Sequence, residues 1–432
     1  MLLIKNGYIL DPESGYEGDA DILIENGRIK KLYLGVTGLV DESLFENLKV
    51  IDANGLYVAP GLVDVHVHFR DPGFEYKEDI ETGAKAAAKG GFTTVVLMAN
   101  TKPVADNEET LTYILEKGKT TAIHVETCCS VSKGLQGKEF CDYKTLLEKG
   151  AVGFTDDGIP LLEEKLVTEA MTRIGALGVP VSLHEEDPNL IANNGINRGK
   201  ASEHFGIGGS PREAEVSMVA RDIEIAKKTG AIVNIQHISC KETADMIRKA
   251  KQEGFLNIHG EATPHHFTLT EEAAIKYGTM AKMNPPLRTK EDKEAIIEAI
   301  KDGTLDIIAT DHAPHSEEEK AKSITEAPSG ILGLETAFAL GVGELVEKNG
   351  MPLIDLIDRM SYAPAKMYGL DAGYIKQDGP ADFIIFDPNE MWRVEGFLSK
   401  SKNSPFLGKM MLGKIKKTIC GGKVVYSDEA IN

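Results

Sequence analysis

The run GLVDVHVHFR at residues 61–70 decides how this chain is interpreted. It is a short apolar segment that ends in two histidines separated by one residue. Because side chains alternate faces along a strand, His66 and His68 point the same way, about 7 Å apart along the chain. Unpaired imidazole nitrogens in an apolar strand cost free energy, and a divalent cation offsets that cost better than a purely structural pairing does. The run therefore predicts a buried strand that carries two metal ligands.

Seven further apolar runs follow at intervals of roughly 25 to 50 residues, and helix-length segments separate most of them. This alternation is typical of a parallel sheet, and eight strands are what an α/β fold of the (β/α)8 TIM-barrel type requires. The eight predicted strands are Leu62–His68, Thr93–Ala99, Ala122–Glu126, Ala151–Thr155, Val181–His184, Ile232–His237, Leu256–Gly260 and Leu305–Thr310.

Both ends of the chain have a different pattern, with short strands and turn residues. Asn26-Gly27 is a strong hairpin signal, and β character returns at residues 381–386 and 418–426. We expect residues 1–58 and 366–432 to form one small β-sandwich that flanks a catalytic barrel at residues 59–365.

Composition narrows the class of protein. The chain has 432 residues and a formal net charge of −19, which disfavours nucleic acid as a partner. No segment approaches the ~20 apolar residues that cross a bilayer, and the amino-terminal residues turn polar too soon for a signal peptide, so we expect no membrane association and a cytoplasmic protein. Five cysteines without Cys-x-x-Cys spacing argue against disulfides and against a thiolate zinc site.

Polar residues gather where the predicted strands end, and barrel enzymes place their chemistry at the carboxyl ends of their strands. These residues are His66, His68, Asn100, Asp156, Asp157, His184, His237 and Asp311. Any one of them alone is as readily a turn or helix-capping residue. Together, imidazoles and carboxylates without thiolates suit Zn²⁺ first, with Mn²⁺, Co²⁺ or Fe²⁺ possible in the same site.

We expect His66 and His68 to hold one ion and His184 and His237 a second, with a carboxylate and a hydroxide between them. Such a site supports amide or ester hydrolysis by a metal-bound hydroxide. Asp311 is the candidate general base and a further ligand, because it closes the last strand and could pass a proton from the hydroxide to the leaving nitrogen. Its alternative role is a helix cap.

The run at residues 61–70 and the following Asp71-Pro72-Gly73 resemble the amidohydrolase superfamily, and specifically the bacterial type I dihydroorotases. Further matching motifs span most of the chain: MANT (98–101), GFTDDG (153–158), HE (184–185), QHIS (236–239), KMNPPLR (282–288) and ATDHAPH (309–315). The resemblance implies a (β/α)8 barrel with a β-sandwich. It also implies reversible cyclisation of N-carbamoyl-L-aspartate to L-dihydroorotate in pyrimidine biosynthesis.

The substrate of that family carries a carboxylate, and a guanidinium near the metal rim is a suitable partner for it. Arg70 lies two residues beyond His68. The resemblance implies that Asn100 and His315 grip the carboxylate with Arg70, and that Asn284 and the backbone near Ser329 and Gly330 hold the ring amides. It also places His68 and Phe69 at the substrate.

Two alternatives remain open at this point. Hydantoinases, dihydropyrimidinases and allantoinases use a carboxylated lysine at the end of the fourth strand, where this chain has Asp156-Asp157. The family pattern assigns the metal bridge to Asp157, although strand alternation allows Asp156. Because an aspartate is shorter than a carboxylated lysine, the number of bound ions, one or two, stays open. A non-catalytic scaffold for aspartate carbamoyltransferase is the second alternative. The resemblance also implies a homodimer and allows that transferase as a partner of an active enzyme.

The other histidines do not fit ligand positions, and we expect His124, His204, His259, His265 and His266 to be structural. The role of His312 stays open. The polar segment from Pro314 to Gly330 is either a lid over the site or an ordinary solvated loop.

Overall fold

The computed structural model describes residues 1–428. Its centre is a ring of eight parallel strands, and each of the eight predicted runs overlaps one of them. They are β6 (Leu62–Val67), β7 (Phe92–Leu97), β8 (His124–Thr127), β9 (Phe154–Thr155), β10 (Val181–Leu183), β11 (Val233–Ile235), β12 (Ile258–Ala262) and β13 (Ile307–Ile308). The predicted α/β barrel is confirmed.

The ring consists of two hydrogen-bonded arcs, β6-β7-β8 and β9-β10-β11-β12-β13. Single parallel bridges join the arcs, between Val67 and His312 at one seam and between Cys129 and Phe154 at the other. Strands β9 and β13 have only two residues each, so polar loop segments begin early at their carboxyl ends.

Strand β6 is buried along its whole length, as its apolar sequence predicts. Its one acidic side chain, Asp64, accepts hydrogen bonds from the backbone N–H of His66 at 3.1 Å and of Thr310 at 3.2 Å. The first strand is thereby linked to the segment that leads into Asp311.

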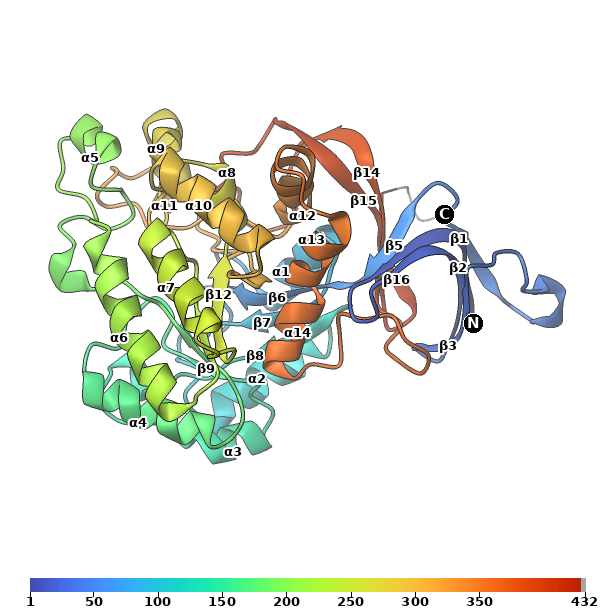
Figure 1. Cartoon of the computed structure of the whole chain (residues 1–432), viewed down its shortest axis with the longest axis horizontal. Helices are drawn as coiled ribbons and strands as arrows, with labels where there is room; N and C mark the ends of the chain where they lie inside the picture. Colours follow the sequence, from blue (N-terminus) through green and yellow to red (C-terminus); the bar gives the residue numbers. More distant parts are fainter. Residues whose placement is uncertain (429–432) are drawn as a thin grey trace.

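Helices surround the ring (Figure 1). They are α1 (Ile80–Lys89), α2 (Glu108–Gly118), α3 (Tyr143–Glu148), α4 (Glu164–Gly175), α5 (Lys200–Phe205), α6 (Glu213–Thr229), α7 (Lys241–Gln252), α8 (Pro264–Thr268), α9 (Glu271–Tyr277), α10 (Lys290–Lys301), α11 (Glu317–Lys320), α12 (Ala337–Leu340), α13 (Leu353–Met360) and α14 (Tyr362–Tyr368).

Helix α1 shows how local sequence fixes these helices. It begins with a capping box in which Asp79 accepts the N–H of Thr82 at 2.8 Å. A Cβ at Gly83 would stand 2.5 Å from the ring of Phe69, so the absence of a side chain lets the helix pack directly on the end of β6. The position of the metal-type residues on β6 is thus supported from outside the ring.

The remaining strands form a second sheet from both ends of the chain, seen in blue and red at the right of Figure 1. Its members are β1 (Leu2–Asp11), β2 (Tyr16–Glu25), β3 (Arg28–Leu34), β4 (Lys49–Asp52), β5 (Tyr57–Pro60), β14 (Phe383–Arg393), β15 (Met410–Cys420) and β16 (Lys423–Ser427). The sheet order is β16-β15-β14-β5-β1-β2-β3, with β4 beside β1. The flanking β unit built from both termini is confirmed, whereas the exact domain limits at residues 58 and 366 stay a prediction.

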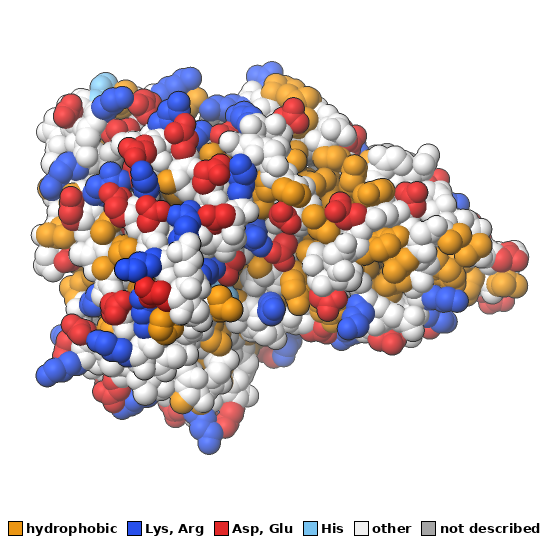
Figure 2. All heavy atoms as spheres, viewed as in Figure 1, with side chains coloured by type: hydrophobic (Ala, Val, Ile, Leu, Met, Phe, Trp, Pro, Cys, Tyr) orange, Lys and Arg blue, Asp and Glu red, His pale blue; other side chains and the backbone are white. Residues whose placement is uncertain are grey.

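The face of the molecule in Figure 2 carries acidic and basic side chains interspersed over the barrel helices. Apolar side chains are more frequent over the terminal sheet on the same face. Within residues 1–428, no helix has the length and apolar character that crossing a membrane requires.

Candidate metal centre and substrate cavity

The carboxyl ends of five strands bring the predicted metal-type residues together. His66 and His68 come from β6 and its end, His184 directly follows β10, and His237 lies two residues beyond β11. Asp157 and Asp311 follow the short strands β9 and β13. All six residues are buried, with at most 8% of each residue exposed. Except for His66, which lies deeper, they line a cavity of about 170 Å³.

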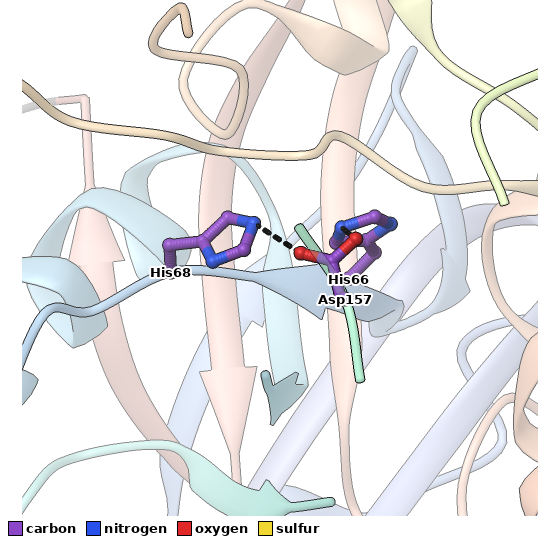
Figure 3. Close-up of side chains that lie close together, drawn as sticks. All are labelled: His66, His68 and Asp157. Carbon is purple, nitrogen blue, oxygen red and sulfur yellow. Dashed lines mark ion pairs between the residues drawn. The ribbon is translucent and has the colours of Figure 1, made fainter. Parts of the chain in front are cut away.

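The first group of donor atoms comes from His66, His68 and Asp157, which converge in Figure 3. His66 Nε2 lies 3.4 Å from Asp157 Oδ1, and His68 Nε2 lies 3.3 Å from Asp157 Oδ2. The other ring nitrogens have protein partners: His66 Nδ1 lies 2.7 Å from Glu261 Oε1, and His68 Nδ1 lies 2.9 Å from Asn100 Oδ1. Glu261 and Asn100 therefore hold each Nδ1, and each Nε2 points into the site.

The second group contains the same aspartate with His184 and His237. Asp157 Oδ1 lies 3.7 Å from His184 Nδ1 and 3.6 Å from His237 Nε2, and these two nitrogens are 2.9 Å apart. His184 Nε2 faces Glu186 Oε2 at 3.1 Å, which leaves Nδ1 as its donor atom toward the site. Asp157 stands between the two histidine pairs.

Asp156 has a different environment. Its carboxylate accepts the backbone N–H groups of Val131 at 2.7 Å and Ser132 at 3.1 Å, and also the Ser132 hydroxyl. These bonds hold a neighbouring loop and turn the side chain away from the histidines. The geometry favours Asp157 over Asp156 as the shared carboxylate.

Asp311 lies against the first group. Its Oδ1 is 3.1 Å from His68 Nε2 and 3.5 Å from His66 Nε2. Burial raises the pKa of Asp311, but the imidazoles of His66 and His68 outweigh that effect and hold its pKa well below the usual range. The carboxylate is thus ionised at neutral pH and able to accept a proton.

Three residues of the site have a left-handed backbone although none is glycine. The φ angles are 61° at Arg70, 34° at His237 and 48° at Asp311. Such conformations cost of order 1–3 kcal/mol each and persist where the surrounding structure enforces them, often at functional sites. Here each one follows a barrel strand and turns a polar side chain toward the cavity.

The donor set fits a divalent cation. Among the described residues, His66 Nε2 and Asp157 Oδ1 are buried without a hydrogen-bond partner. Two such atoms in contact, with three further imidazoles and a second carboxylate nearby, are costly unless a cation binds them. Nitrogen and oxygen donors without sulfur match Zn²⁺, Mn²⁺ or Co²⁺.

The cavity is also lined by a positive charge, that of Arg70. Arg70 is held by Pro314, whose carbonyl accepts from Nε at 3.2 Å, and its Nη2 lies 3.3 Å from His315 Nε2. Arg70, His315, Asn284 and Ser329 all line the cavity. Within residues 1–428, Asn284 Oδ1 and Ser329 Oγ are buried and have no hydrogen-bond partner. These are free polar atoms for a ligand.

Two of the residues expected to contact substrate, Phe69 and Gly330, have other contacts within the protein. The Phe69 ring is in the core, edge-on to His312 and beside Gly83, because alternation along the strand sends it to the face opposite His68. Gly330 lines the cavity, but its N–H donates to the Lys282 carbonyl at 2.9 Å. Contacts of these two residues with substrate stay a prediction.

The segment from Pro314 to Gly330 combines exposed and buried residues. Lys320 is buried, and its ammonium donates to the carbonyls of Pro328 at 2.9 Å and Gly330 at 3.1 Å. A lid motion of this segment remains a prediction.

Sequence reasoning missed Glu261, which is fully buried in β12. Besides His66 Nδ1, it accepts the backbone N–H of His237 at 3.2 Å and the amide of Asn234 at 3.0 Å. It thus orients a residue of each histidine pair. Its signal was available, since it directly follows the predicted strand Leu256–Gly260, as the other site residues follow theirs.

Comparison with known proteins agrees with this geometry. Residues 55–243 match the family described as Dihydro-orotase-like. The chain is 53% identical to a dihydroorotase of Clostridioides difficile over 99% of its length and 100% of the relative's, and 50% identical to one of Clostridium acetobutylicum with the same coverage. The chain belongs to the dihydroorotase family.

Solved structures agree on the architecture. An L-hydantoinase from Arthrobacter aurescens superposes with a TM-score of 0.86 at 25% identity and covers 100% of this chain and 97% of its own. A D-hydantoinase from Thermus sp. gives 0.84 at 26% identity, with 99% and 96% covered. The chain is a metal-dependent cyclic amidohydrolase with a small-molecule substrate.

The role of Glu261 can be tested through metal affinity. We expect Glu261→Gln to lower the affinity for Zn²⁺ about 10- to 100-fold, because His66 loses the carboxylate that fixes its ring and tautomer. Competition with a chelator measures this. Glu271→Gln is the matched control, since Glu271 is also buried but bonds to Asn197 and the N–H of Ala201. Equal affinities for the two variants would contradict the assignment.

Proposed function

We propose that this chain catalyses the reversible cyclisation of N-carbamoyl-L-aspartate to L-dihydroorotate, a step of de novo pyrimidine biosynthesis, at the cavity described above. The observation that carries the proposal is the pairing of a fixed guanidinium with a buried set of metal-type donors in one small cavity. A compact ring with a single carboxylate fits this combination. Full-length identity of about half to dihydroorotases supports the same reaction.

We propose Zn²⁺ as the metal, with one or two ions per chain. His66, His68 and Asp311 would hold one ion, His184 and His237 the second, and Asp157 would lie between them. When bound, such ions acidify a water molecule and polarise a carbonyl oxygen.

Arg70 would bind the substrate carboxylate, with His315 and Asn100 beside it. The guanidinium is already held by the Pro314 carbonyl, so little side-chain freedom is lost on binding. Asn100 also bonds to His68 Nδ1, which couples the carboxylate subsite to the orientation of a metal-type histidine. Asn284 and Ser329 would supply partners for the ring amide groups.

Asp311 would move the proton. In the hydrolytic direction, water adds to the ring carbonyl that derives from the aspartate side chain, and the bond from this carbon to the ring nitrogen breaks. Asp311 accepts the proton released by the water and returns it to the departing nitrogen. Cyclisation is the reverse: Asp311 takes a proton from the carbamoyl nitrogen as it attacks the side-chain carboxyl group, and a water molecule leaves.

Hydantoinase-like hydrolysis is the second candidate, and the likeness to L- and D-hydantoinases in architecture is the observation that favours it. Their ring substrates lack the carboxylate of dihydroorotate, whereas this cavity presents Arg70. A scaffold without catalysis would not need the converging donor groups. For location and assembly we propose a cytoplasmic homodimer, with aspartate carbamoyltransferase as a partner, on the strength of the family resemblance.

Removal of the guanidinium tests the substrate assignment. We expect Arg70→Met to weaken binding of dihydroorotate about 10- to 100-fold in KM, because charge-assisted hydrogen bonds to the carboxylate are lost. Activity toward dihydrouracil, which has no carboxylate, should change little. Arg248→Met is the control, because that arginine pairs with Asp245 and Asp302 on the surface. If the unaltered enzyme preferred an uncharged ring such as dihydrouracil over dihydroorotate, the substrate assignment would be wrong.

Replacement of Asp311 tests the proton transfer. We expect Asp311→Asn to lower kcat by about 10²- to 10⁴-fold, since the amide cannot accept the proton. Steady-state kinetics with thermal unfolding as a fold check measures the effect. Asp306→Asn, at the other end of the same barrel segment and paired with His259 and Lys251, should stay near normal. Near-normal turnover of Asp311→Asn would refute its role.

A further inference from the structure

A second set of metal-type donors lies at the joint between the barrel and the terminal sheet. We call His124, Asp382 and Cys420 the junction cluster. His124 opens β8, Asp382 precedes β14, and Cys420 ends β15. Because the barrel strands are parallel, His124 lies at their amino ends, opposite the carboxyl ends that carry the catalytic histidines.

The donor atoms of the junction cluster are close enough for one ion. A ring nitrogen, a carboxylate oxygen and the thiol sulfur all lie within 4.8 Å of one another, and His124 Nε2 is 3.0 Å from Asp382 Oδ2. Ligands in a tetrahedral zinc site are roughly 3.3–3.8 Å apart, given bonds of about 2.0–2.3 Å. The separations here, from 3.0 Å to at most 4.8 Å, span that range.

Two of the three donors are held by the backbone around them. Asp382 Oδ1 accepts the N–H of Gly421 at 2.6 Å, and the Asp382 carbonyl accepts the N–H of Gly61 at 3.0 Å. Cys420 Sγ lies 3.7 Å from the Thr93 carbonyl at the start of β7. The carboxylate and the thiol thus have a fixed separation, as a binding site requires.

The third donor gives access from solvent. Asp382 and Cys420 are buried, whereas the His124 side chain is 49% exposed. It borders a surface pocket of about 960 Å³ that Glu126, Cys420 and Gly421 also line. An ion could enter from this pocket, and a water molecule could complete a four-coordinate site there.

We propose that the junction cluster is a second metal site, which binds one thiophilic divalent cation of the Zn²⁺ class through His124, Asp382 and Cys420. The chemistry is the combination of imidazole, carboxylate and thiolate, which suits Zn²⁺ and Co²⁺ and disfavours Mg²⁺ and Ca²⁺. The bound ion would connect β8 of the barrel to β14 and β15 of the terminal sheet. Its role is to stabilise this joint, away from the reacting atoms.

Without an ion, hydrogen bonds of the His124 ring to Asp382 and Cys420 raise the pKa of His124 to about 11. The imidazole is then cationic and forms an ion pair with Asp382. A bound cation would replace this proton and that of the thiol. The two states differ in whether Cys420 is a thiolate ligand, which a spectroscopic probe can detect.

Cobalt distinguishes this site from the catalytic one. Of the groups of metal-type donors in the described residues, the two around Asp157 contain no cysteine. Thiolate-to-cobalt charge transfer in the near ultraviolet therefore reports the junction cluster alone. We expect the full-length, reduced, chelator-treated chain to develop this band on titration with Co²⁺ and to saturate at one equivalent for the site.

Matched variants complete the test. Cys420→Ser should abolish the band, and Cys141→Ser, which changes another buried cysteine, should keep it. His124→Gln should weaken cobalt binding about tenfold or more, while His259→Gln, which alters the part-buried pair with Asp306, should not. Because the His124 side chain is half exposed, His124→Gln disturbs the packing less than Cys420→Ser does. The cobalt affinity of His124→Gln therefore tests the site if Cys420→Ser fails to fold. A band missing from the unaltered chain, or one that survives in Cys420→Ser or is unchanged in His124→Gln, would overturn the proposal.

Discussion

The carboxylate of Asp157 between two pairs of histidines is the interaction on which the rest of the structure depends. Its oxygens lie 3.3–3.7 Å from ring nitrogens of His66, His68, His184 and His237. Such a concentration of buried donors is costly in a protein interior unless a cation compensates it. The barrel supplies the rigidity to hold them, because each comes from the end of a strand whose neighbours are fixed by hydrogen bonds.

Hydrogen-bond partners fix the orientation of three of these imidazoles. Glu261, Asn100 and Glu186 each face the ring nitrogen that points away from the centre. They leave one lone pair of each ring directed inward. Arg70 adds a guanidinium to the same cavity as the imidazole and carboxylate groups. This combination favours a substrate that has both a carboxylate and an amide.

The strand series and the residues at its ends could be predicted from the sequence, because alternation along a strand and parallel pairing are strong constraints. His66, His68, His184 and His237 follow from that reasoning alone. Asp157 and Asp156 could not be separated by it, since β9 has only two residues and the chain beyond it no longer alternates. Their roles depend on the Val131–Ser132 loop, which only the fold brings near Asp156. The contact between Cys420 and His124 likewise could not be predicted, because the two residues are almost three hundred positions apart in the chain.

Anomalous X-ray diffraction from crystals grown with Zn²⁺ tests the central claim most directly, because it locates metal ions without reference to activity. The account predicts zinc density beside Asp157, on the side of His66 and His68 and, when a second ion is bound, on the side of His184 and His237. A fully zinc-loaded, active crystal with no zinc within bonding distance of Asp157 would contradict it.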